Sequence, residues 1–174
     1  MNTIILYGSE YGATRRYAEK LAEQTGLPAV SYEKAGSLAG YEQIVYLGGL
    51  YAGGVKGLKK TAKKFPAGAR LILVTVGLAD VQDPKNIENI RRSLRTQLPA
   101  EVLQSAALFH LRGGIDYGRL SFAHKTMMTL LYNHARKLPP EQQNAETKAM
   151  IDTFGQKVDF VDFAALRPVA DAMQ

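Results

Sequence analysis

The chain has 174 residues, 46% of them hydrophobic, and a formal net charge of +6 at pH 7. This length and composition are typical of a globular protein, and we expect residues 1–174 to form a single domain. The sequence contains no cysteine, which excludes disulfides, thiolate nucleophiles and cysteine-held iron–sulfur clusters, so any redox chemistry requires a bound cofactor.

The sequence also bears on location and on partners. It has no apolar run of the roughly 18 residues that a membrane span needs, and its N-terminus lacks the pattern of a signal peptide. We therefore expect a cytoplasmic protein, and we leave open peripheral contact with the inner face of the membrane. The basic residues are scattered over predicted helices without an RNA-binding or helix-turn-helix motif, so we expect no nucleic acid partner.

The most specific pattern lies at the start of the chain. A short apolar run, Ile4 to Leu6, predicts a buried strand, and a helical pattern begins at Thr14. The loop between them, residues 8–14, has the sequence GSEYGAT. Its hydroxyls and the free N–H groups of a helix N-terminus can bind an anion, and Gly12 lets the backbone approach it closely. The loop is neither a Walker A motif nor a dinucleotide fingerprint, so a terminal phosphomonoester fits it better. The alternative is a turn and a capped helix without a ligand.

Strands and helices alternate over the following residues. Strands are expected at residues 29–32, 43–47, 71–76 and 106–112, and helices at 14–24, 55–64 and 84–98. Each of the last three strands ends in a glycine-containing loop, at residues 48–54, 77–80 and 113–118. This alternation predicts an α/β fold with a doubly wound parallel sheet, helices on both faces and ligand loops at the carboxyl ends of the strands.

The C-terminal third has a different pattern. Residues 119–137 predict a long amphipathic helix, followed by a helix at 141–153, a strand near 158–161 and a closing helix from Phe163, in which Pro168 marks a kink or an early stop. The apolar side of the long helix comprises Leu120, Ala123, Met127, Leu130, Leu131 and His134. This side is either core or a surface for a partner, a quinone or a membrane.

With Ser9, Gly12 and Thr14 in the first loop and glycine-rich loops after the later strands, the chain resembles the flavodoxin family over essentially its whole length. The resemblance implies a five-stranded sheet in the order 2-1-3-4-5 and a bound FMN. Tyr11 departs from the family pattern, because it stands where a Ser or Thr is usual. The turn at residues 113–120 and the long helix after it are most similar to the branch that contains menaquinone-dependent protoporphyrinogen oxidase.

The resemblance also implies which residues bind FMN. The phosphate would be held by Ser9, Glu10, Tyr11, Gly12, Ala13 and Thr14, with Glu10 and Tyr11 acting mainly through their backbone N–H groups. The ring would lie between two later loops, formed by Gly49, Leu50, Tyr51, Ala52 and Gly53 and by Gly77, Leu78, Ala79 and Asp80. Tyr51 is the candidate for covering the ring. Gly114 and Tyr117 are candidates for a substrate cleft, and we expect the helix at 119–137 to border the flavin cleft.

The function implied by this resemblance is that of an FMN-dependent oxidoreductase. It would move electrons or hydride between a reduced substrate, such as a porphyrinogen, and a quinone or another acceptor. Two alternatives remain open: a one-electron carrier for redox partner proteins, and an interaction module without FMN. No catalytic side chain is assigned, because the chemistry takes place on FMN. The three histidines have no spacing that suits a metal, so no metal site is expected.

Overall fold

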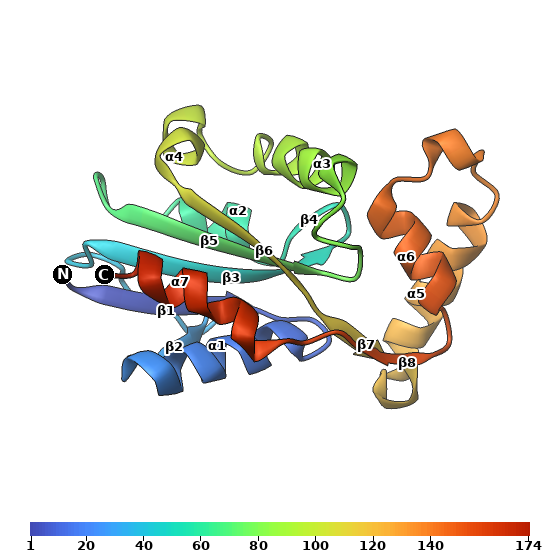
Figure 1. Cartoon of the computed structure of the whole chain (residues 1–174), viewed down its shortest axis with the longest axis horizontal. Helices are drawn as coiled ribbons and strands as arrows, with labels where there is room; N and C mark the ends of the chain where they lie inside the picture. The colour runs from blue at the N-terminus through green and yellow to red at the C-terminus, as the bar shows by residue number, and fades with distance from the viewer.

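Five parallel strands form the central sheet of the computed structural model, which describes residues 1–174 (Figure 1). From one edge to the other they are β2 (Ala29–Ser31), β1 (Thr3–Gly8), β3 (Gln43–Tyr51), β5 (Arg70–Gly77) and β6 (Ala107–Arg112). Numbered along the chain, the order of these five strands is 2-1-3-4-5. The predicted α/β fold with a doubly wound parallel sheet is therefore confirmed.

The central strand β3 is buried on both faces, which explains its nearly continuous apolar sequence. Val45 and Leu47 point to one side of the sheet, and Ile44 and Tyr46 point to the other, because successive side chains of a strand alternate. Residues of β1 and β5 divide between the same two clusters of buried side chains. The sheet thus separates two hydrophobic cores, and each of them needs a layer of helices.

Helices cover both faces of the sheet (Figure 1). α1 (Ala13–Thr25) and α7 (Arg167–Ala172) pack on one face, and α2 (Leu58–Ala62), α3 (Pro84–Leu94) and α4 (Ala100–Ser105) pack on the other. The closing helix predicted from Phe163 begins as a 3-10 turn, Phe163–Leu166, and continues as α7. Pro168 lies in the first turn of α7, where its missing N–H costs no hydrogen bond. The prediction that it marks a kink or an early stop is therefore wrong.

The segment after Leu47 differs most from the prediction. Residues 48–51, predicted as a loop, continue β3, and β4 (Gly54–Val55) pairs with them in the antiparallel direction. Only Ala52 and Gly53 turn the chain, with positive φ angles of 49° and 78°. α2 is shorter than the predicted helix 55–64, because Gly57 has a left-handed backbone just before it. The six-residue helix α4 was not predicted.

A separate helical unit stands beyond the carboxyl ends of the strands (Figure 1). It is joined to the sheet through a two-stranded antiparallel ribbon of β7 (Gly114–Asp116) and β8 (Lys157–Asp159). The strand predicted near 158–161 thus does not belong to the main sheet. Residues 117–156 between these strands contain α5 (Phe122–Ala135) and α6 (Ala145–Thr153), and 3-10 turns at Tyr117–Arg119 and Pro140–Gln142. We call residues 117–156 the α5–α6 unit.

Of the two alternatives for the apolar side of α5, core or partner surface, the structure does not show a fully buried core face. Met128 and Ala135 are buried, whereas Leu130 is 66% exposed and Leu131 is 42% exposed. Apolar residues lie around much of this helix, so their spacing alone does not select the side that packs. None of the helices of the protein combines the length and the apolar character that crossing a membrane requires.

Leu47 and Leu130 form a matched pair for testing the core, because the first is fully buried and the second is 66% exposed. We expect Leu47→Ala to lower the free energy of unfolding by about 2–5 kcal/mol, since it removes buried methyl groups and leaves a cavity. Leu130→Ala should change it by no more than about 0.5 kcal/mol. Urea denaturation followed by circular dichroism measures both values. Equal losses in the two variants would contradict this arrangement of the core.

Candidate functional site

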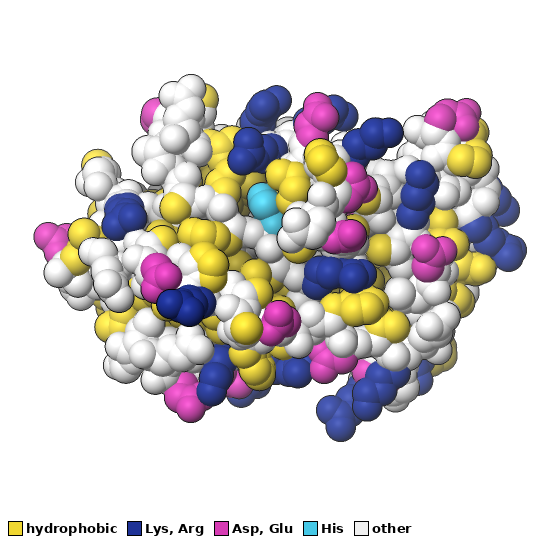
Figure 2. Space-filling model, viewed as in Figure 1, with side chains coloured by type: hydrophobic (Ala, Val, Ile, Leu, Met, Phe, Trp, Pro, Cys, Tyr) yellow, Lys and Arg dark blue, Asp and Glu magenta, His cyan; other side chains and the backbone are white.

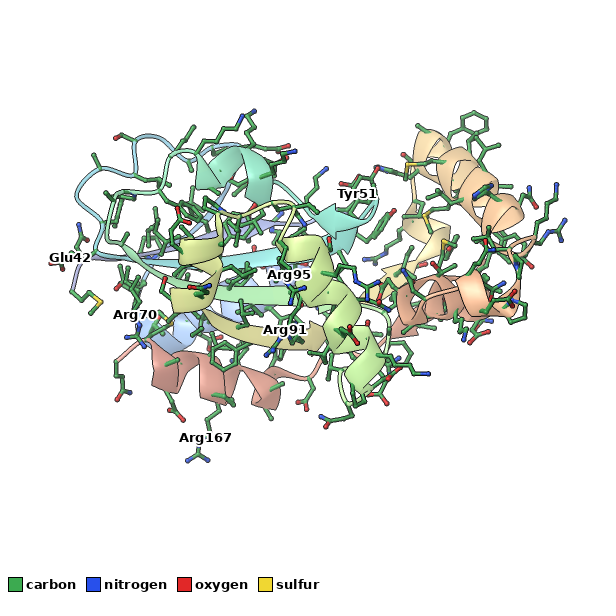
Figure 3. All side chains as sticks on the ribbon, turned by 90° about the horizontal axis from the view of Figure 1, so that it is seen from above. Glu42, Tyr51, Arg70, Arg91, Arg95 and Arg167 are labelled. Atoms are coloured by element: carbon green, nitrogen blue, oxygen red, sulfur yellow. The ribbon has the colours of Figure 1, made fainter.

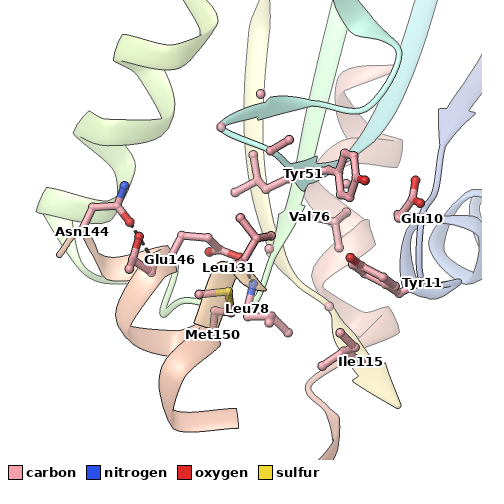
Figure 4. Close-up of a pocket in the computed structure, with 18 of the residues that line it drawn as sticks. Glu10, Tyr11, Tyr51, Val76, Leu78, Ile115, Leu131, Asn144, Glu146 and Met150 are labelled. Carbon is pink, nitrogen blue, oxygen red and sulfur yellow. Dashed lines mark hydrogen bonds between the residues drawn. The ribbon is translucent and has the colours of Figure 1, made fainter. Parts of the chain in front are cut away.

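The carboxyl ends of the central strands and the α5–α6 unit enclose a cavity of about 550 Å³ (Figure 4). Three loops form its wall on the side of the sheet: residues 9–14 after β1 (the first loop), residues 49–54 in the β3–β4 hairpin (the second loop) and residues 77–80 after β5 (the third loop). Helices α5 and α6 contribute the opposite wall. Open α/β sheets bind ligands at this edge, and the volume suits a small molecule.

Most residues predicted to bind a cofactor or substrate line this cavity. They are Ser9, Glu10, Tyr11, Ala13, Thr14, Gly49, Leu50, Tyr51, Ala52, Gly53, Gly77, Leu78 and Gly114. Gly12, Ala79, Asp80 and Tyr117 do not line it. Ala79 and Tyr117 are buried, and Asp80 Oδ1 accepts a hydrogen bond from the N–H of Gln82 within a turn.

The first loop presents hydrogen-bond donors at the N-terminus of α1. Gly12 precedes the helix with a left-handed backbone (φ 96°), and its N–H donates to Ser9 Oγ at 3.1 Å. The N–H groups of Ala13 and Thr14 have no partner within the helix, because they precede its first hydrogen bonds. A Cβ added to Gly12 would meet no atom within 4 Å, so the loop needs this glycine for its backbone conformation. These donors and the helix dipole suit an anion.

Glu10 was predicted to act through its backbone, but its side chain forms the centre of a polar network. One carboxylate oxygen pairs with Lys56 Nζ, and the other lies 2.6 Å from His124 Nε2 on α5. Nδ1 of His124 lies 3.0 Å from Ser121 Oγ. The hydrogen bond with Glu10 raises the pKa of Lys56 above its ordinary value. Lys56 therefore offsets the negative charge of Glu10 beside the anion-binding donors of the first loop.

Two tyrosines connect the first and second loops to α5. The rings of Tyr11 and Tyr51 meet edge to face with their centroids 6.4 Å apart. Tyr11 donates a hydrogen bond to Met128 Sδ at 3.3 Å, and Tyr51 donates one to Met127 Sδ at 3.1 Å. Burial raises the pKa of Tyr11, so its phenol stays protonated. Figure 3 shows Tyr51 on the side of the sheet that faces the α5–α6 unit, where it forms an aromatic wall of the cavity.

The third loop is held from two directions at Leu78. Arg112 of β6 donates to the carbonyl oxygen of Leu78 from Nε and Nη2, at 3.1 and 2.7 Å. From the other direction, the carboxylate of Glu146 on α6 accepts hydrogen bonds from the N–H groups of Leu78 and Ala79, at 2.8 and 3.1 Å. Neither Arg112 nor Glu146 was singled out from the sequence, although both fix the shape of a predicted cofactor loop.

Most of the lining residues that were not among the predicted cofactor or substrate residues lie in helices or directly beside them. α3 contributes Asn86, Asn89, Ile90 and Ser93, and the α5–α6 unit contributes Met128, Leu131, His134, Ala135, Leu138, Asn144, Glu146, Thr147 and Met150. The long helix lies beside this cavity. Its individual lining residues carry no local signal, because only tertiary packing decides which side of a helix faces a cavity. No Lys or Arg lines the cavity, while two carboxylates, Glu10 and Glu146, do.

A family model described as the flavodoxin domain matches residues 4–141 of the chain. Among solved structures, the chain is similar to a candidate flavoprotein from Bacteroides uniformis ATCC 8492, with 18% identity, 64% of this chain and 88% of that chain covered, and a TM-score of 0.46. It is also similar to a cysteine-to-alanine variant of flavodoxin from Pseudomonas aeruginosa, with 21% identity, 78% and 97% of the two chains covered, and a TM-score of 0.40. No curated protein matches the chain.

Proposed function

The chain belongs to the flavodoxin-domain family, and we propose that it is an FMN-dependent oxidoreductase whose substrate binds between FMN and the α5–α6 unit. The observation that carries the proposal is the shared cavity, in which three predicted cofactor loops face a wall of helices. When bound, FMN supplies the hydride and one-electron chemistry. The protein's own residues bind and orient the cofactor and shelter the reaction from water.

The first loop fits the phosphate of FMN. Ser9, Ala13 and Thr14 line the cavity beside the N-terminus of α1, so their hydroxyl and N–H groups can donate to phosphate oxygens. Tyr11, which replaces the usual hydroxyl residue, directs its phenol to Met128, which leaves its backbone N–H as its group for the phosphate. The charge of Glu10 is offset by Lys56, which reduces its repulsion of a phosphate.

The helical side of the cavity favours an uncharged and partly apolar substrate. Its lining includes Met128, Leu131, Leu138 and Met150. The carboxylates of a porphyrinogen would find no Lys or Arg within the cavity, and burying an unpaired charge is costly. We therefore favour a quinone as the molecule bound there. A porphyrinogen fits only if its carboxylates stay outside, near the basic residues of α5.

Ser9→Ala combined with Thr14→Ala tests the phosphate site. We expect the double variant to bind FMN at least about tenfold more weakly, because it loses two hydrogen bonds to a charged group, each worth about 1.5–3 kcal/mol. Quenching of FMN fluorescence measures the dissociation constant. Thr96→Ala combined with Ser105→Ala is the control, since these hydroxyls bond only to nearby backbone carbonyls. If the Ser9/Thr14 variant kept its FMN affinity, the site assignment would be wrong.

Reoxidation by a short-chain naphthoquinone tests the reaction. We expect yellow purified protein, which an FMN-free module would not give, and, once the flavin has been reduced with dithionite, saturable reoxidation by the quinone, which a one-electron carrier would not show. Leu131→Glu should raise the KM for the quinone at least about fivefold, because it places a charge on the apolar wall. Leu130→Glu is the matched control, since Leu130 is exposed and does not line the cavity. An equal KM in the two variants would place the quinone elsewhere.

We also propose that the outer side of α5 contacts an anionic membrane surface. Phe122 and Leu130 are 87% and 66% exposed, and Lys125, Arg136 and Lys137 are exposed on or just after the same helix. Figure 2 shows basic side chains at the end of the molecule where Figure 1 places α5 and α6. Exposed apolar side chains beside Lys and Arg are typical of helices that lie at a membrane interface.

Charge reversal at Lys125, Arg136 and Lys137 tests this contact. We expect the triple Glu variant to bind vesicles of phosphatidylglycerol and phosphatidylcholine at least about tenfold more weakly at low salt, because each basic residue contributes about 1 kcal/mol at an anionic surface. Its FMN affinity should stay unchanged. The same reversal of Lys59, Lys60 and Lys63, exposed residues in and just after α2, is the control. Equal vesicle binding by the two triple variants would exclude the contact at α5.

A further inference from the structure

Glu146 differs from the other carboxylate of the cavity in what neutralises it. Glu10 pairs with Lys56, whereas Glu146 makes no ion pair, and both of its carboxylate oxygens accept hydrogen bonds from backbone N–H groups of the third loop. Figure 4 shows Glu146 extending from α6 toward Leu78 at the wall of the cavity. Its negative charge therefore faces the cavity without an ion-pair partner.

The third loop and α6 are both shaped for this contact. A Cβ on Gly77 would lie 2.9 Å from Glu146 Oε2 and 2.7 Å from Leu50 Cδ1, so any larger residue there would make Glu146 or Leu50 shift. Glu146 lies in the first turn of α6, after the capping residue Asn144, where the helix dipole favours a negative charge. The local sequence on both sides thus accommodates the Glu146 carboxylate at this position.

The loop that Glu146 holds is also fixed elsewhere. Arg112 binds the carbonyl of Leu78, and its guanidinium stacks on the ring of Phe160, 3.7 Å from the centroid. Further along, Asn86 Nδ2 donates to the carbonyl of Asp80 at 2.8 Å. Of these contacts, only the one from Glu146 comes from the α5–α6 unit, so it makes the shape of the third loop depend on that unit.

We propose that Glu146 is a positioning residue for FMN, which fixes the third loop beside the ring and lowers the reduction potential of the bound cofactor. This inference rests on the proposed function. Reduction adds negative charge to the cofactor, and a nearby carboxylate without a cationic partner opposes that charge. Removing the charge of Glu146 while keeping its shape therefore favours the reduced form.

Two substitutions separate the two roles. Glu146→Gln keeps one oxygen acceptor and removes the charge, and Glu146→Ala removes both. We expect Glu146→Ala to raise the dissociation constant of FMN at least about fivefold, because two N–H groups of the third loop lose their partner. We expect Glu146→Gln to shift the midpoint potential of bound FMN to a more positive value. The control is Glu141→Gln, an exposed residue of the same unit that does not line the cavity.

Fluorescence quenching gives the dissociation constants, and anaerobic spectroelectrochemical titration of the FMN-loaded full chain gives the potentials. Tighter or equal FMN binding by Glu146→Ala would overturn the positioning role and mark Glu146 as a competitor for the loop. An unchanged potential in Glu146→Gln would overturn the charge effect. If Glu146→Ala fails to fold by circular dichroism, the potential of Glu146→Gln decides the proposal. Failure of the unmodified protein to bind FMN would instead refute the proposed function.

Discussion

The pairing of β3 between β1 and β5 is the constraint on which the candidate site depends. In the observed register, Gly8 lies opposite Gly48, and Gly49 lies opposite Val76, so the three loops leave the sheet at nearly the same level. The ends of the strands also pack closely: a Cβ on Gly48 would lie 2.0 Å from Val55 Cγ1. The glycines at the ends of these strands are therefore needed mainly because neighbouring strands leave no room for a side chain there. Through this packing they bring the loops together around one cavity.

The α5–α6 unit is held against these loops more than against the sheet. His124 bonds to Glu10 of the first loop, and Met128 accepts a hydrogen bond from Tyr11. Met127 accepts one from Tyr51 of the second loop, and Glu146 binds the third loop. Each loop that faces a bound cofactor is thus also a docking point for the unit. Ligand binding and the position of α5 and α6 must therefore influence each other, because they depend on the same side chains.

The sequence predicted the strands and the three loops because buried parallel strands are short apolar runs that end in glycine, whereas the strand order was implied by the resemblance to the flavodoxin family. It missed the extension of β3 to Tyr51, since glycines in a hairpin pair through their backbone and leave no hydrophobic pattern. It also missed Glu146, which contacts the loop at Leu78 across 68 positions of the chain. Contacts of this kind depend on how the helical unit docks, and no local spacing encodes them.

The charges around the cavity also bear on how FMN would be oriented. At the first loop, an anionic group meets helix N–H groups and a glutamate that Lys56 neutralises, whereas at the third loop it meets the uncompensated charge of Glu146. The phosphate is therefore favoured at the first loop and disfavoured at the third, where the uncharged ring can lie without this repulsion. Because no Lys or Arg lines the cavity to reverse this preference, the two glutamates distinguish one end of the cofactor from the other.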